Sequence, residues 1–137
     1  MVFATTQMPA MNMAMPDVCL TPIPSPVGPI PTPIPYPNMA MTAMGIPSQV
    51  KVLTLAMPNH NMMTITPMSN GNNPGVMLNP LSGMVMGPQR QLLGSVKTFM
   101  GGLPANKMLG LSGQNGMMPG AFGATLSPSQ VKVMVLA

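Results

Sequence analysis

Proline places the strongest constraint on this chain, because prolines recur at almost every second position over much of residues 16–37. Each proline holds φ near about −65° and lacks a backbone N–H, so the segment is predicted to form neither a helix nor a central strand. We expect an extended arm of the polyproline II type. Apolar side chains between the prolines favour an arm packed on the rest of the chain over a disordered linker or a ligand of SH3 domains. These side chains are Ile23, Val27, Ile30, Ile34 and Tyr36.

Charge and methionine content decide whether a chain of 137 residues with such an arm can fold. Charged residues make up 4% and the net charge is +4, which excludes disorder driven by charge repulsion. The 20 methionines supplement 31 Leu, Ile, Val and Phe residues, and we expect methionine to fill much of the core. Every apolar stretch is interrupted by Pro, Gly or a polar residue, so we expect no membrane-spanning helix. Scattered cations and only 3% aromatics argue against nucleic-acid binding.

A short motif occurs three times after the arm. Residues 48–53 (Ser-Gln-Val-Lys-Val-Leu) recur at 129–134 as Ser-Gln-Val-Lys-Val-Met, and a weaker copy, Gly-Ser-Val-Lys-Thr-Phe, spans 94–99. Alternating side chains predict a short β-strand in each copy, and Asn, Gly and Pro between the copies predict tight turns. We predict an all-β fold in one domain, residues 1–137. Residues 1–47 are the Met- and Pro-rich arm packed on it, and residues 48–137 form three related, turn-rich β modules.

Groups that could carry out chemistry are scarce. General acid–base catalysis needs at least two positioned titratable groups, and the side chains offer one carboxylate, Asp17, one thiol, Cys19, and one imidazole, His60, besides one phenol and the cations. We therefore expect no catalytic residues and no enzyme activity. A zinc site in this chain would use Cys19 and His60, with Asp17 or water completing the shell.

Several elements in a fixed order resemble the PAAR-like family of the Pro-Tyr-Pro-Asn type. They are Cys-x-Thr-Pro at 19–22, Pro-Tyr-Pro-Asn at 35–38, glycines spaced from 75 to 102, and Pro-Ser-Gln-x-Lys-Val at 128–133. The resemblance implies a small cone that caps the trimeric, VgrG-like spike of a contractile injection machine, such as a bacterial type VI secretion system. It also implies synthesis in the bacterial cytoplasm, assembly on the machine, and delivery outward or into a target cell.

The same resemblance bears on a metal at the tip of the cone. Simple PAAR proteins resemble zinc proteins with three His and one Cys near the tip. This chain has Gly71-Asn72 where relatives often show Gly-Asp, and Gln114-Asn115 where they often show His-Asn. The expected cofactor is a zinc ion, or none.

The predicted function is that of a non-enzymatic structural cap that sharpens the tip of a trimeric spike and helps to carry effectors. A monomer can meet three identical subunits by presenting three similar surfaces. Lys51, Lys97 and Lys132 recur at one place in the three copies and are the predicted partner-binding residues. Two alternatives remain open. One is a Pro-rich surface scaffold, and the other is a copper-binding protein whose methionines, spaced by two residues, supply thioether ligands for Cu(I).

Overall fold

The computed structural model describes residues 2–135 and consists mostly of strands and turns. Residues 1, 136 and 137 of the predicted domain lie outside this range. The elements are β1 (Val2–Phe3), β2 (Met11–Ile23), β3 (Ile30–Met41), the 3-10 turn η1 (Thr42–Met44), β4 (Leu53–Thr54), β5 (Met57–Pro58), β6 (Ile65–Thr66), β7 (Gln89–Gln91), β8 (Phe99–Met100), β9 (Leu103–Pro104), β10 (Leu111–Gln114), β11 (Ala121–Thr125) and β12 (Met134–Val135). The predicted all-β fold is confirmed. Within the described range, no helix is long and apolar enough to cross a membrane.

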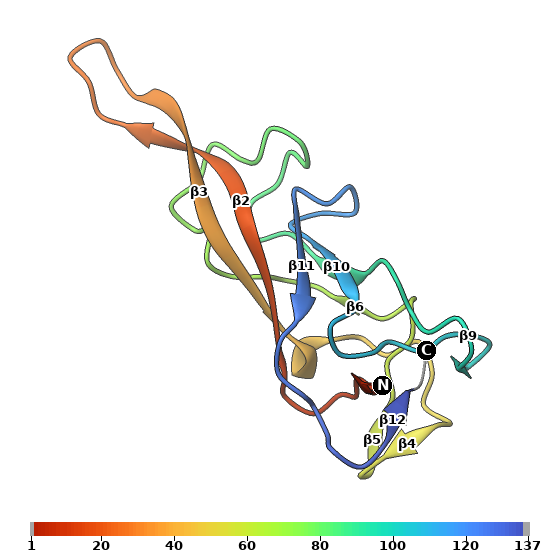
Figure 1. The fold of residues 1–137 in the computed structure, drawn as a ribbon. Coiled ribbons are helices and arrows are strands. Elements are labelled where there is room, and N and C mark those ends of the chain that lie inside the picture. Colours follow the sequence, from red (N-terminus) through yellow and green to blue (C-terminus); the bar gives the residue numbers. More distant parts are fainter. Residues whose placement is uncertain (1, 136–137) are drawn as a thin grey trace.

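Six strands form the largest sheet, in the order β3-β2-β11-β10-β7-β6, and every neighbouring pair in it is antiparallel. The sheet therefore joins the Pro-rich part of the chain to later segments. Three two-stranded sheets, β1-β12, β4-β5 and β8-β9, lie toward the end of the molecule where both chain ends are found (Figure 1). The loop of the β2–β3 hairpin projects at the opposite end (Figure 1). The molecule is thus elongated, with different structures at its two ends.

The Pro-rich segment is extended, as predicted, but its strands pair in this hairpin, so the expectation of a polyproline II conformation is wrong. Strands β2 and β3 pair over most of their length, with Leu20 opposite Pro33. In an antiparallel pair of strands, only alternate residues exchange backbone hydrogen bonds across the pair. The backbone N–H and C=O groups of the residues between them point away from the partner strand, and we call these residues the outward set. Leu20 belongs to the outward set, because its N–H donates to the carbonyl of Leu78 at 3.0 Å on the other side. The β3 prolines, spaced by two, share the outward set with Pro33, where a missing N–H removes no bond between the strands.

The far end of the hairpin is exposed. Ile23, Val27 and Ile30 expose 42%, 95% and 49% of their surface, so the expectation that these side chains pack on the domain is wrong. Nearer the sheet, the hydroxyl groups of Thr21 and Tyr36 lie 2.6 Å apart and link β2 to β3. The pairing of β2 with β3 continues to Ile23 opposite Ile30, and this end of the hairpin extends beyond the rest of the molecule (Figure 1).

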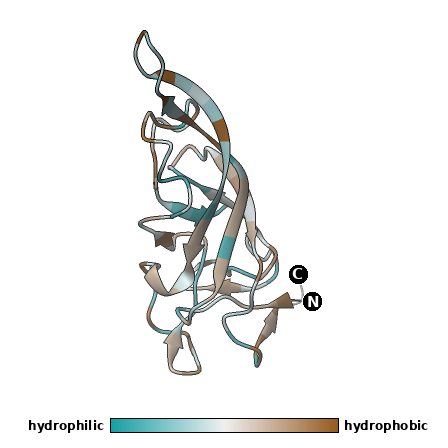
Figure 2. Cartoon of the chain, turned by 90° about the vertical axis from the view of Figure 1, so that its left-hand side faces the viewer, coloured by the Kyte–Doolittle hydropathy of each residue, from teal (hydrophilic) through white to brown (hydrophobic). Residues whose placement is uncertain are grey.

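The interior is polar, so the expectation of a core filled by methionine is wrong. Among the described residues, Met100 is the only methionine that is buried, in a small cluster with Ala4, Ala105 and Val135. Hydrophilic residues lie on strands in the middle of the molecule, and apolar residues occur along the projecting hairpin (Figure 2). Buried polar groups are stable only when they are hydrogen-bonded, so amides and hydroxyls that bind loop backbone hold this fold together. The largest fully buried side chains include Gln114, Asn12, Asn38, Asn59, Asn61, Asn72, Asn79 and Asn115.

Candidate functional site

The three sequence repeats become three equivalent hairpins, β4–β5, β8–β9 and β12–β1. In each, the first residue of the first strand points outward and the second is buried. Leu53, Phe99 and Met134 expose 54%, 60% and 45% of their surface, whereas the residues that follow them are buried. The third hairpin takes its second strand from the other end of the chain, so the two ends together complete one module.

A side chain in each repeat closes the same turn. The Oε1 atom of Gln49 accepts hydrogen bonds from the N–H groups of Lys51 and Val52, at 3.0 and 2.8 Å. Gln130 accepts in the same way from the two residues at the equivalent positions, at 2.7 and 2.8 Å. In the weaker copy, the hydroxyl of Ser95 accepts from Lys97 and Thr98, at 3.3 and 3.0 Å. The Val-Lys pair of each repeat therefore lies in a turn, and the short strand predicted in each copy begins only at Leu53, Phe99 or Met134.

A ring of backbone hydrogen bonds joins the three modules. The N–H of Thr5 donates to the carbonyl of Asn106 at 3.0 Å, Asn106 donates to His60 at 3.0 Å, and His60 donates to Thr5 at 2.9 Å. The ring is closed, and each module contributes one donor and one acceptor to it. This end of the molecule, which we call the base, therefore has pseudo-threefold symmetry.

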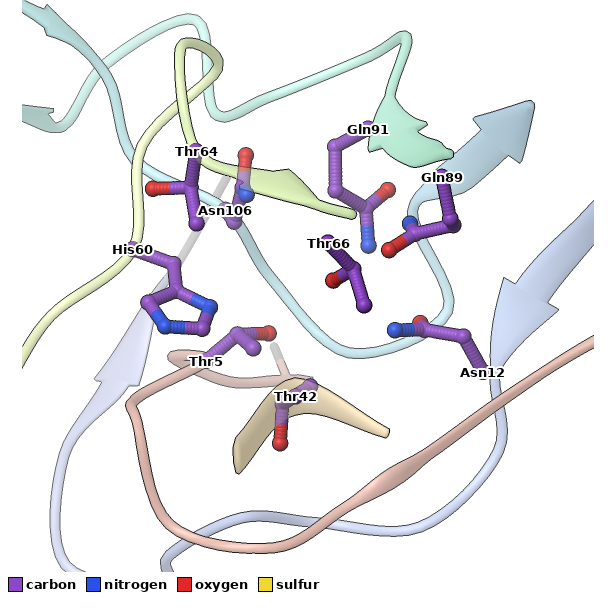
Figure 3. A pocket seen from close by; sticks show the side chains of 9 residues that line it. All are labelled: Thr5, Asn12, Thr42, His60, Thr64, Thr66, Gln89, Gln91 and Asn106. Atoms are coloured by element: carbon purple, nitrogen blue, oxygen red, sulfur yellow. The ribbon is translucent and has the colours of Figure 1, made fainter. Parts of the chain in front are cut away.

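Polar side chains surround a cavity next to this ring (Figure 3). Its volume is about 10 Å³, and a polar space of that size suits a single water molecule. Two buried oxygens of the lining, Thr5 Oγ1 and Asn106 Oδ1, have no hydrogen-bond partner within the protein. The lining residues are Thr5, Asn12, Thr42, His60, Thr64, Thr66, Gln89, Gln91 and Asn106.

His60 is a neutral structural residue in this cavity. The amide nitrogen of Gln7 donates to the carbonyls of Ala43 and Gly45, both at 2.7 Å, so the Gln7 oxygen is directed to the imidazole. The Nε2–H of His60 therefore donates to that oxygen at 2.8 Å. Burial lowers the pKa of His60 to about 4, so the ring is uncharged near neutral pH.

The structure assembles some predicted site residues and separates others. Lys51, Lys97 and Lys132 occupy the same exposed turn position in the three modules. Cys19 lies beside Asp17, whereas His60 lies in the cavity of Figure 3. Over residues 2–135, no three His, Cys, Asp or Glu side chains gather at one point. The structure therefore does not combine Asp17, Cys19 and His60 into one metal site.

The methionines spaced by two residues lie opposite one another on the hairpin. Met11 pairs with Met41 and Met13 pairs with Met39 across β2 and β3. Met11, Met39 and Met41 are exposed, while residues between them, such as Asn12 and Ala40, are buried. These methionines therefore lie on an outer face of the sheet. Copper binding by their thioethers stays a prediction.

Asp17, the only carboxylate side chain of the protein, is completely buried in a cage of four asparagine amides. Each of its two oxygens accepts hydrogen bonds from two of these amides. Oδ2 accepts from Asn38 and Asn72 at 2.9 and 2.7 Å, and Oδ1 accepts from Asn79 and Asn115 at 2.7 and 3.2 Å. We call these five residues the amide cage. In the sequence, Asn72 and Asn115 stood out only as neutral replacements and Asn38 only as the last residue of the Pro-Tyr-Pro-Asn element, and no local pattern indicated Asn79.

Cys19 lies against the cage and stays protonated. Burial, and then the negative charge of Asp17, raise the pKa of the Cys19 thiol to about 11. The thiol donates to Asp17 Oδ1 at 3.6 Å, and the Asn72 and Asn115 amides donate to the sulfur at 3.5 and 3.7 Å. A thiolate is the nucleophile and the metal ligand, so this site disfavours both roles for Cys19.

The fold and its base define a small all-β protein with internal pseudo-threefold symmetry at one end. Residues 10–120 match the family model described as the toxin PAAR-like domain, and the chain belongs to this family. It is a structural and toxin-associated family rather than a known enzyme family, with spike-tip or toxin-associated roles in secretion systems. No curated protein and no solved structure matches the chain.

Proposed function

We propose that the protein is a non-enzymatic cap that docks its base on the end of a trimeric, VgrG-like spike, one copy per trimer. The observation that carries the proposal is the pseudo-threefold base, in which one chain presents three equivalent hairpins around a closed ring of backbone hydrogen bonds. A single chain can contact three identical subunits in the same way only if it offers three similar surfaces. Family membership supports the same proposal.

The base carries the same exposed side chains three times. Val50, Val96 and Val131 expose 68%, 78% and 66% of their surface. A lysine follows each valine, and an exposed large apolar residue, Leu53, Phe99 or Met134, lies three positions after it. Apolar side chains that recur on one face in this way are typical of a surface that a partner covers.

Apolar contact is expected to supply most of the affinity. Full burial of one such side chain contributes about 1.5 to 3 kcal/mol. An exposed ion pair of a lysine contributes about 1 kcal/mol or less, so Lys51, Lys97 and Lys132 set register and the rate of approach. With the base docked, the β2–β3 hairpin points away from the spike and forms the leading end of the capped spike (Figure 1). Effectors bound along the sides would travel with the cap.

The mass of the complex with a cognate VgrG-like trimer, measured by native mass spectrometry, tests the proposal. We expect one copy per trimer. Aspartate is introduced separately at Val50, Val96 and Val131, and each change is expected to weaken binding by a similar factor. The matched control is Val27→Asp at the hairpin end, which should bind as the unmodified protein does.

Two results would contradict the proposal. Three copies per trimer, or a free protein that is itself a stable trimer, would exclude docking through internal pseudo-threefold symmetry. Unchanged binding in all three base variants would place the interface elsewhere on the protein.

A further inference from the structure

The amide cage brings together segments that are distant in the sequence. Its carboxylate comes from β2, and the four amides come from residues 38, 72, 79 and 115. The carboxylate of Asp17 and the thiol of Cys19 lie side by side at its centre. An acid and a thiol are ligand types that a metal ion uses, so the remaining groups decide whether an ion can bind here.

Three of the amides cannot turn their oxygens inward. Asn72 Oδ1 accepts from the backbone N–H of Met86 at 3.2 Å, and Asn115 Oδ1 accepts from Gly87 at 3.0 Å. Asn79 Oδ1 accepts from Leu81 at 2.7 Å and from a second N–H at 3.3 Å. A flipped amide would set its NH₂ group against these backbone donors and its oxygen against the carboxylate. The backbone therefore fixes these three amides with their donors toward Asp17.

This donor set suits a negative charge and does not fit a metal ion. Oxygen-binding cations need lone pairs, whereas the amides turn N–H groups inward. Zinc would need a thiolate and further His or carboxylate ligands. Packing leaves little room as well, since a Cβ atom on Gly75 would overlap the Cβ atom of Cys19.

We propose that the amide cage takes the place of a structural metal: the Asp17 carboxylate on β2 cross-links strand β3, the β6–β7 loop and the loop after β10 through neutral amides, and the site excludes divalent cations. The hydrogen bonds are charge-assisted and buried, which makes each stronger than a bond between neutral groups. This proposal concerns how the protein is held together and is independent of what binds its base.

The first test uses the unmodified protein, purified with and without added Zn²⁺. We expect a metal content far below one ion per chain and the same thermal unfolding midpoint with and without a chelator. One ion per chain, together with a midpoint lowered by the chelator, would overturn the proposal. This measurement does not depend on any variant folding.

The second test is Asn79→Asp, which replaces one inward donor by a second carboxylate at nearly constant volume. In the presence of chelator we expect the midpoint to fall by about 5 °C or more, because two buried carboxylates then face each other. Added Zn²⁺ or Ca²⁺ should recover part of this loss. The matched control is Asn70→Asp at an exposed asparagine. Equal midpoints for Asn79→Asp and Asn70→Asp in chelator would show that the amide donors do not hold the carboxylate.

Discussion

Replacement of Gln130 by alanine tests the turn on which the base depends. Its oxygen accepts from the N–H groups of Lys132 and Val133, at 2.7 and 2.8 Å. Its nitrogen donates to the carbonyls of Ala4 and Val133, at 3.0 and 2.7 Å. Gln130→Ala removes all four bonds. One of them, to Ala4, joins the C-terminal part of the chain to its N-terminal part.

The expected loss follows from these contacts. A hydrogen bond within a protein contributes about 0.5 to 1.5 kcal/mol net. The N–H groups of Lys132 and Val133 lie in an exposed turn and can bind water instead, whereas Ala4 is buried. We therefore expect a loss of about 2 to 3 kcal/mol in the free energy of unfolding. For a chain of 137 residues, this lowers the midpoint by about 7 to 10 °C.

Urea and thermal unfolding followed by circular dichroism measure the effect. Gln49 forms the equivalent four bonds in its own module, so Gln49→Ala should cost about as much. The control is Lys132→Ala, in the same turn, which should stay within about 0.5 kcal/mol of the unmodified protein. A loss below about 0.5 kcal/mol in Gln130→Ala would refute the argument that these side chains hold the turns.

Three further predictions concern single residues. The pKa of His60 is lowered from 6.5 to about 4 in the folded protein, so the unfolded protein binds more protons between these pH values. The contribution of His60 to the free energy of unfolding is therefore fully present above pH 6.5 and falls by up to about 1.4 kcal/mol per pH unit between pH 6.5 and 4. The free energy of unfolding of His60→Gln should depend less on pH across this window. Since the pKa of the Cys19 thiol is raised to about 11, a thiol reagent at pH 8 should label the native protein far more slowly than the protein in urea, and equal rates would contradict the buried thiol. Gly123→Ala should lower the free energy of unfolding by about 1 to 3 kcal/mol, because the new Cβ atom would overlap the carbonyl of Met13 on the neighbouring strand. Calorimetry measures this loss. The control is Gly83→Ala, where the space is open and only the left-handed backbone of Gly83 adds a cost.

Patterns of short range could be interpreted from the sequence. Prolines spaced by two residues required an extended backbone, because proline fixes φ and lacks an N–H group. Strand β3 is such a backbone, and its prolines lie at positions that form no hydrogen bond with β2. The Val-Lys repeat predicted three related modules, and equivalent turns at Gln49, Ser95 and Gln130 appear in the structure. These features were accessible because each is formed by residues within a few positions of one another.

The direction in which side chains point was not accessible in this way. Alternation along a strand separates two faces but does not say which face is buried. We expected apolar residues inside, yet Asn12 and Asn38 are buried while Met11 and Met39 are exposed. The reason is tertiary: Asn12 accepts from the Thr125 hydroxyl and Asn38 donates to Asp17, and these buried polar partners come from distant parts of the chain.

The sequence by itself determined an all-β chain with an extended Pro-rich segment, three related modules and almost no ionisable groups. Tertiary structure decided the pairing of β1 with β12, the closed ring at the base and the amides that surround Asp17. Each of these joins residues that lie far apart in the chain, such as Asp17 and Asn115, which are 98 positions apart. A local pattern carries no information on such pairs, because their geometry exists only once the whole chain has folded.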